Sequence, residues 1–177
     1  NTHVNLKPVI RGDEAKLDAQ VHDQASFGRL ADQVAKEYGL DPNQFRAQLQ
    51  AESAAFSNGY KQAMGHKGDL DRGANASVGL GQISGNFLNG GSWANALTNT
   101  PQFGNQNVSS QQYMNSVTTQ LRMAAASDAL RIHRVGSLDG ALRQYVSGHS
   151  NADSQNQIYI DNINKYMQDE EMMNIGR

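Results

Sequence analysis

One glutamate, Glu52, stands among small and apolar residues in the stretch QLQAESAAF, residues 48–56. Phe45, Leu49 and Glu52 are spaced i, i+4 and i+7, so in a helix all three share one face. An apolar surround and the partial negative charge of a helix C-terminus both raise a carboxyl pKa. Because a glutamate that stays protonated near neutral pH can act as a general acid, Glu52 is the first candidate for a catalytic residue.

Glu52 also has purely structural interpretations. It could form an ion pair with an arginine such as Arg46 or Arg122, or it could reach solvent past a short side chain. Structural ion pairs perturb carboxyl groups as active sites do, so both interpretations stay open on the evidence of this helix alone.

A glycine-rich segment follows the candidate glutamate. Residues 57–91 hold nine of the 17 glycines of the chain, with Asn, Ser and Asp between them, which predicts turns and irregular backbone. We expect this segment to form the wall of a groove. Within ASVGLGQIS, residues 76–84, Gly79 and Gly81 permit close approach to the backbone, and the amide of Gln82 can both donate and accept hydrogen bonds. The same glycine pair is equally typical of a β-hairpin corner.

Together, AES at residues 51–53 and SVGLGQI at residues 77–83 resemble the two-part signature of the lytic transglycosylases, a family with a lysozyme-like fold. LRQYVSG, residues 142–148, lies where that family has a Tyr-Asn-x-Gly motif, and YIDNINKY, residues 159–166, resembles its closing helix. The resemblance covers about residues 27–167. It implies that Glu52 is the catalytic acid, that Tyr145 hydrogen-bonds near Glu52 and steadies it, and that substrate is bound by Ser53, Ser77, Gly79, Gln82 and Tyr145.

The resemblance also implies a reaction. Members of the family cleave the β-1,4 bond between N-acetylmuramic acid and N-acetylglucosamine in peptidoglycan, with one glutamate as acid and then as base on the muramic acid C6 hydroxyl. Attack by a hydroxyl of the substrate needs no ordered water and so no second carboxylate. A second carboxylate facing Glu52 would instead indicate a hydrolytic muramidase. Asp69, Asp71 and Asp153 are the candidates, although their polar segments favour solvated loop charges.

Three features depart from the family pattern. Ser77 lies 25 positions after Glu52, which indicates an enlarged loop over residues 57–76. Branches associated with secretion and conjugation machines, and some phage enzymes, resemble the chain in this spacing, which implies action in the bacterial periplasm or cell wall. Gly81 replaces a usual Met and predicts a more open groove floor. Val146 replaces an Asn, so a weakly active glycan-binding or structural module of a phage particle or secretion apparatus stays an alternative.

The elements that must position these residues are mostly helical. We expect one helix from Ser26, as N-cap, to Gly39, and a second opened by Asp41 and Pro42. A long helix should follow from Tyr113 toward Leu130, with further helices over residues 139–145 and 160–167. The predicted fold class is mainly α, a lysozyme-like domain over residues 26–167 with a small irregular or β element around residues 57–91. Residues 1–25 are expected to be an arm or linker outside the core, and residues 168–177 a frayed tail.

Composition limits the partners. The 177 residues include 15 Lys and Arg against 17 Asp and Glu, a formal net charge of −2, so we expect no basic field for nucleic acid or anionic membrane. Cysteine is absent, and there is no run of 18 apolar residues that would span a membrane. His66, Asp69 and Asp71 do not fit a calcium loop, so no metal or cofactor is expected. The start at Asn1 suggests part of a larger protein or assembly.

Overall fold

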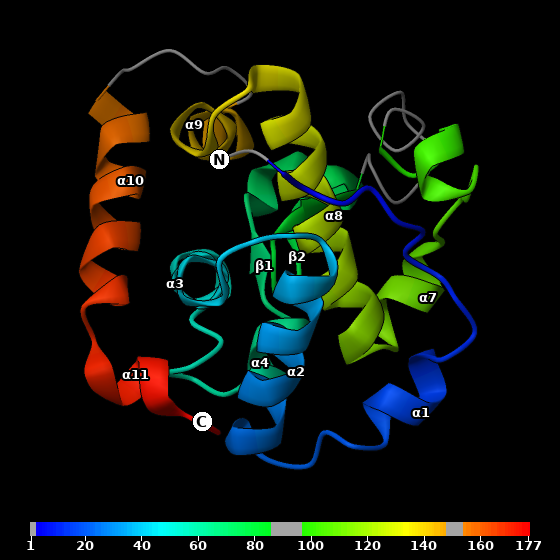
Figure 1. The fold of residues 1–177 in the computed structure, drawn as a ribbon, viewed down its shortest axis with the longest axis horizontal. Coiled ribbons are helices and arrows are strands. Elements are labelled where there is room, and N and C mark those ends of the chain that lie inside the picture. The colour runs from blue at the N-terminus through cyan, green and yellow to red at the C-terminus, as the bar shows by residue number, and fades with distance from the viewer. Residues whose placement is uncertain (1–2, 86–96, 148–153) are drawn as a thin grey trace.

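The computed structural model describes residues 3–85, 97–147 and 154–177 of the chain (Figure 1). These residues are mainly helical with one small three-stranded antiparallel sheet, which confirms the mainly α class and the small β element. The elements, with η marking a 3-10 helix, are α1 (Glu14–Asp18), α2 (Gln24–Glu37), α3 (Pro42–Ser53), α4 (Tyr60–Met64), β1 (Lys67–Gly68), η1 (Leu70–Asn75), β2 (Ser77–Val78), β3 (Ile83–Ser84), η2 (Pro101–Phe103), α7 (Ser110–Met114), α8 (Val117–Val135), α9 (Leu138–Ser147), α10 (Ser154–Met167) and α11 (Glu170–Asn174).

Helices α2 and α3 begin at capping residues. Asp23, and not Ser26, is the N-cap of α2, because the Asp23 carboxylate accepts from the Ser26 backbone N–H while the Ser26 hydroxyl accepts from Asp23 N–H. Asp41 caps α3 as expected, accepting from Asn43 N–H at 2.9 Å. The third turn of α3 ends at Ser53, and Ala54 follows in the left-handed region with a φ of 55°. The position of Glu52 near this C-terminus is therefore confirmed.

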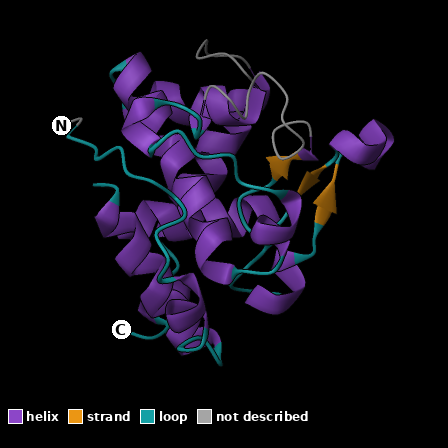
Figure 2. Ribbon diagram, turned by 90° about the vertical axis from the view of Figure 1, so that its right-hand side faces the viewer, coloured by secondary structure: helices purple, strands orange, loops and turns teal. Residues whose placement is uncertain are grey.

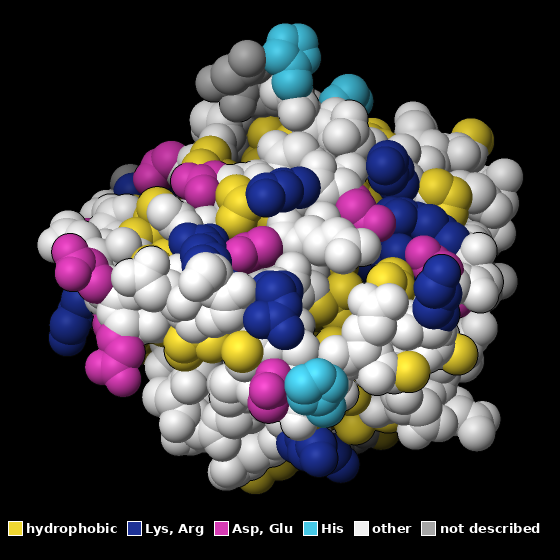
Figure 3. Space-filling model, turned by 60° about the horizontal axis from the view of Figure 1, so that its bottom comes forward, with side chains coloured by type: hydrophobic (Ala, Val, Ile, Leu, Met, Phe, Trp, Pro, Cys, Tyr) yellow, Lys and Arg dark blue, Asp and Glu magenta, His cyan; other side chains and the backbone are white. Residues whose placement is uncertain are grey.

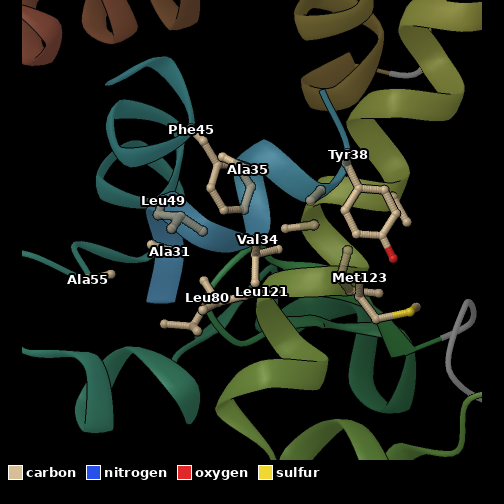
Figure 4. Packing of buried hydrophobic residues seen from close by; sticks show 14 of the residues in the cluster. Ala31, Val34, Ala35, Tyr38, Phe45, Leu49, Ala55, Leu80, Leu121 and Met123 are labelled. Atoms are coloured by element: carbon tan, nitrogen blue, oxygen red, sulfur yellow. The ribbon is translucent and has the colours of Figure 1, made fainter. Parts of the chain in front are cut away.

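The core lies where α2, α3 and α8 meet. Helix α3 runs between α2 and α10 and packs against both (Figure 1). Figure 4 shows apolar side chains from these helices pointing toward one another, with Leu80 reaching them from the turn that follows β2. The labelled members are Ala31, Val34, Ala35, Tyr38, Phe45, Leu49, Ala55, Leu80, Leu121 and Met123. A rigid helical frame thus holds both α3 and the glycine-rich turn.

The small sheet sits at one side of the helical body (Figure 2). Its strand order is β1-β2-β3, with Gly68 opposite Ser77 and Ser77 opposite Ser84. The tight connection between β2 and β3 holds Gly79 and Gly81, so the hairpin-corner interpretation of this glycine pair is correct. The remainder of the predicted element, residues 86–91, lies outside the described residues.

The first 25 residues are not a detached arm. Val9 is completely buried in the main apolar cluster, and Tyr38 donates its hydroxyl to the carbonyls of Lys7 and Pro8 at 3.1 Å. Helix α1 packs against α8. The expectation that this segment stays outside the core is therefore wrong, and the helical body begins well before Ser26.

Two further expectations change. Tyr113 belongs to the short helix α7, and Ser116 then caps a separate helix α8, because its side chain accepts from Thr119 N–H. The C-terminal residues are not frayed, since α11 buries Met172 and Met173 and Arg177 pairs with Asp32 at 2.9 Å. Within the parts of the chain that the structure describes, no helix is both long and apolar enough to cross a membrane.

Candidate functional site

Glu52 lies in the last turn of α3 and faces α10. Its side chain is partly exposed, and its Oε2 accepts a hydrogen bond of 2.6 Å from the hydroxyl of Tyr159. Burial raises the pKa of Tyr159 well above the usual value, so this hydroxyl keeps its proton and acts as the donor. The carboxyl group is thus fixed in direction on one side, in a residue that is partly exposed.

Burial is also the largest influence on the protonation of Glu52 and raises its pKa to about 7. The Tyr159 hydrogen bond and the charge of Arg131 act in the opposite direction, whereas the charges of Asp128 and Asp69 raise the pKa further. At neutral pH the carboxyl group is therefore present in both protonated and ionised forms, as a group that must give and later accept a proton requires.

The two arginines considered as ion-pair partners of Glu52 are engaged elsewhere. Arg46 pairs with Asp32, with Nε 2.8 Å from Oδ1. Arg122 is completely buried and its guanidinium binds Asp13, Glu14 and Glu37. The ion-pair interpretation of Glu52 with either arginine is therefore wrong.

Ser53, the neighbour of Glu52, connects α3 to the glycine-rich turn. It is buried, and its hydroxyl donates to the carbonyls of Leu49 at 3.1 Å and Leu80 at 2.9 Å. Because both bonds go to backbone, Ser53 holds the turn against α3 and does not present a free hydroxyl to a ligand. The expected substrate-binding role of Ser53 is replaced by this structural one.

The two glycines of the turn are required by close packing. Gly79 has a φ of 89°, and a side chain there would meet the side-chain oxygens of Tyr113 and Gln120 at 2.5 Å. A Cβ on Gly81 would lie 2.6 Å from the Ala124 Cβ and 2.9 Å from the Tyr145 hydroxyl. The space that a larger residue would occupy is filled by protein, so Gly81 does not give the more open floor that we expected.

Gln82 and Ser77 lie on the sheet side of the site and are partly exposed. The Gln82 amide donates to the carbonyls of His66 at 2.9 Å and Gly79 at 3.0 Å, which stabilises the turn. The Ser77 hydroxyl donates to Oδ2 of Asp69 across 3.5 Å. Both residues keep polar atoms near the surface of the sheet.

Tyr145 contributes through the turn and not through a direct bond to Glu52. Its hydroxyl donates to the carbonyl of Gly81, and the Arg131 guanidinium lies 5.1 Å from its ring centroid. The tyrosine that steadies Glu52 is Tyr159. Sequence reasoning placed Tyr159 in the closing helix without a role, although its spacing of four residues from Ile163 puts both on the face of the helix that is buried.

The three candidates for a second catalytic carboxylate differ in their relation to Glu52. Asp69 precedes η1 in the left-handed region, with a φ of 50°, and its charge acts on Glu52 as described above. Asp71 is exposed and is not among the main influences on the pKa of Glu52. Asp153 lies outside the described residues. Asp69, between β1 and η1, is therefore the candidate whose charge raises the pKa of Glu52.

Charged side chains of both signs occupy the face of the molecule that Figure 3 presents. Figure 3 shows Lys and Arg side chains interspersed with Asp and Glu on the face that it presents. Among the residues with described positions, no group of three or more His, Cys, Asp or Glu side chains could hold a metal ion.

Comparisons with protein-family models, with curated proteins and with solved structures find no match to this chain.

Proposed function

We propose that this chain is a peptidoglycan lytic transglycosylase that cleaves the β-1,4 bond between N-acetylmuramic acid and N-acetylglucosamine, with Glu52 as the only catalytic carboxyl. The observation that carries the proposal is the state of Glu52: partly exposed, oriented by Tyr159 and with a pKa of about 7. The order of the motifs around Glu52, Gln82 and Tyr145 supports the substrate class.

In the proposed reaction Glu52 first gives its proton to the glycosidic oxygen as the bond from C1 of the muramic acid to that oxygen breaks. The ionised Glu52 then takes the proton of the C6 hydroxyl of the same sugar, whose oxygen attacks C1 and closes the 1,6-anhydro ring. Glu52 ends protonated, so no water or external base is consumed. Ser77 on β2 and Gln82 in the turn before β3 are partly exposed polar residues that would contact the glycan.

The proposed setting is the bacterial cell wall. We propose that the chain serves local penetration of peptidoglycan in the periplasm, as part of a phage virion or of a secretion machine, and acts with other parts of a larger protein or assembly. The enlarged segment between Glu52 and Ser77, which folds as α4, β1 and η1, supports this placement.

A hydrolytic muramidase is the second candidate, and Asp69 favours it. A carboxylate coupled to the acid from across the site could hold a water for attack on C1, as inverting glycosidases do. The two reactions give different ends: an anhydro sugar for the transglycosylase and a reducing sugar for the muramidase.

Mass spectrometry of the soluble products from purified peptidoglycan tests the proposal. We expect anhydro-muropeptides from the wild-type chain and from Glu170→Gln, which removes an exposed glutamate on α11, and a loss of at least about 100-fold for Glu52→Gln. Asp69→Asn should keep the anhydro products if Glu52 acts alone.

Other outcomes would overturn the proposal in distinct ways. Reducing-end products that disappear in Asp69→Asn would establish a muramidase. Binding to sacculi without release of soluble fragments would indicate a glycan-binding or structural module, an alternative that the exposed Val146 beside Tyr145 keeps open, with 43% of its surface accessible.

A further inference from the structure

A second carboxyl group lies buried behind the candidate acid. Asp128, on α8, is only 6% exposed, and its Oδ1 accepts a hydrogen bond of 2.9 Å from Nε2 of Gln48. Gln48 is itself 1% exposed and belongs to α3. The carboxyl of Asp128 is therefore anchored to the same helix that carries Glu52, on the side away from solvent.

Gln48 and Glu52 are four residues apart, so their side chains are neighbours on one face of α3, with Cβ atoms about 5–6 Å apart. The amide of Gln48 reaches Asp128, and the carboxyl of Glu52 lies one helical turn further along. The charge of Asp128 acts on Glu52, and in a poorly hydrated interior two nearby like charges repel each other more strongly than they would in water.

Asp128 resembles Glu52 in its response to this environment. Burial raises its pKa to about 7, against the opposing effects of the Gln48 hydrogen bond and the Arg131 charge. Two carboxyl groups that titrate in the same range and repel each other lose their protons as a coupled pair. Besides Asp128 and the Tyr159 hydroxyl, Asp69 before η1 and Arg131 on α8 act on Glu52. The charge of Glu52 in turn raises the pKa of Tyr113 on α7, Tyr145 on α9 and Tyr159 on α10. From α2, Asp32 and Glu37 are occupied by Arg46 and Arg122.

We propose that Asp128 is a positioning residue for the reaction of Glu52: held against α3 by Gln48, its carboxyl increases the share of Glu52 that is protonated at neutral pH. Asp128 does not touch substrate. It acts through Glu52, by making the simultaneous ionisation of both groups unfavourable. The inference rests on the proposed function for its meaning in catalysis, but the electrostatic coupling can be measured without any substrate.

The test is a pH titration of the Glu52 side-chain carboxyl by carbon-13 NMR in glutamate-labelled protein, with the signal identified by its loss in Glu52→Gln. In Asp128→Asn the amide oxygen can still accept from Gln48, whereas the negative charge is gone. We expect the Glu52 midpoint to fall by roughly half to one pH unit. Asp139→Asn is the matched control, because it removes an exposed carboxylate that pairs with Arg143, and it should leave the midpoint in place.

The reverse titration guards against a variant that fails to fold. In aspartate-labelled Glu52→Gln, the Asp128 midpoint should fall by a similar amount, because coupling between two sites is reciprocal. An unchanged Glu52 midpoint in folded Asp128→Asn, or an unchanged Asp128 midpoint in Glu52→Gln, would overturn the proposal. A chain that shows the coupling and yet releases no muropeptides would refute the proposed function alone.

Discussion

The hydroxyl of Tyr159 and Oε2 of Glu52 lie 2.6 Å apart, and this hydrogen bond joins α10 to the last turn of α3. Because the bond stabilises the ionised carboxylate, it lowers the pKa that burial raises. The two effects together leave Glu52 near 7, so the protonation of the candidate acid depends on a contact between helices more than 100 residues apart in sequence.

Tyr159→Phe tests this contact. Loss of the donor should raise the Glu52 midpoint and move the alkaline limb of the pH profile of peptidoglycan release to higher pH. Because the carboxyl also loses its fixed direction, we expect kcat to fall by about 10-fold at the optimum. Tyr166→Phe, a partly buried tyrosine on the same helix, is the control. A lower rate with an unchanged pH profile would mean that Tyr159 orients Glu52 without changing its pKa.

Buried carboxyls with raised pKa values make the fold less stable as pH rises. The folded-state pKa of Asp128 is about 7 against an ordinary value of 3.8, so the native state holds a proton that the unfolded chain has already lost. The stability that this proton contributes is fully present below the ordinary pKa of the carboxyl group, and it is lost as pH rises through the folded-state pKa. Glu52 affects stability in the same direction, because its pKa is raised from an ordinary value of 4.5 to about 7 in the folded state.

Asp128→Asn should therefore be more stable than the wild type at alkaline pH. We expect a gain of roughly 2–4 kcal/mol in the free energy of unfolding near pH 8 and a difference of less than about 1 kcal/mol near pH 4. Urea unfolding of both proteins at the two pH values measures the difference. An equal effect at both pH values would show that Asp128 acts through packing and not through its charge.

Gly81→Ala should destabilise the turn beside the site. The new Cβ would lie 2.6 Å from the Cβ of Ala124. Because Ala124 is held in α8, the turn or Tyr145 must move instead. We expect a loss of about 1–3 kcal/mol, measured by thermal or urea unfolding. Gly65→Ala is the matched control, since its nearest atom lies at 3.9 Å and its φ is −100°. A stable Gly81→Ala chain would show that the turn adjusts without cost.

Arg122→Leu should unfold the protein far more easily than Arg134→Leu. Arg122 is completely buried, and its removal leaves Asp13 and Glu14 without their cation and Glu37 with Arg11 alone. We expect a loss of about 3 kcal/mol or more, whereas the exposed Arg134 on the same helix should change stability by less than about 0.5 kcal/mol. Equal midpoints of urea unfolding would contradict the structural importance of this network.

Local patterns in the sequence predict the helices and the place of Glu52 well. Asp41 and Pro42 predict the start of α3, because N-capping and the preference of proline for the first helical position depend only on adjacent residues. The same reasoning places the start of α2 too late, at Ser26, since Asp23 and Ser26 share one capping box and either type can serve as the cap. It also joins Tyr113 to α8, because an apolar stripe continues across the break at Ser116.

The electrostatics of the site depend on contacts that no local pattern reveals. In the sequence, Asp128 cannot be told from a solvent-exposed acid on a helix of apolar and small residues. Only the packing of α8 on α3 brings it to Gln48, 80 residues earlier. For the same reason the charges of Asp13 and Glu14 look like those of a linker, because their partner Arg122 is more than 100 residues away. Tyr159 and Tyr145 are likewise distinguished only by the packing of α9 and α10.

The contacts of the N-terminal segment constrain the order in which the chain can fold. Asp18 accepts from the backbone N–H and hydroxyl of Thr118, 100 residues further on, and Asp13 binds Arg122. During synthesis this segment leaves the ribosome well before α8, so its binding surface does not exist until about 100 further residues have followed. The segment must therefore dock late, after α8 has been made.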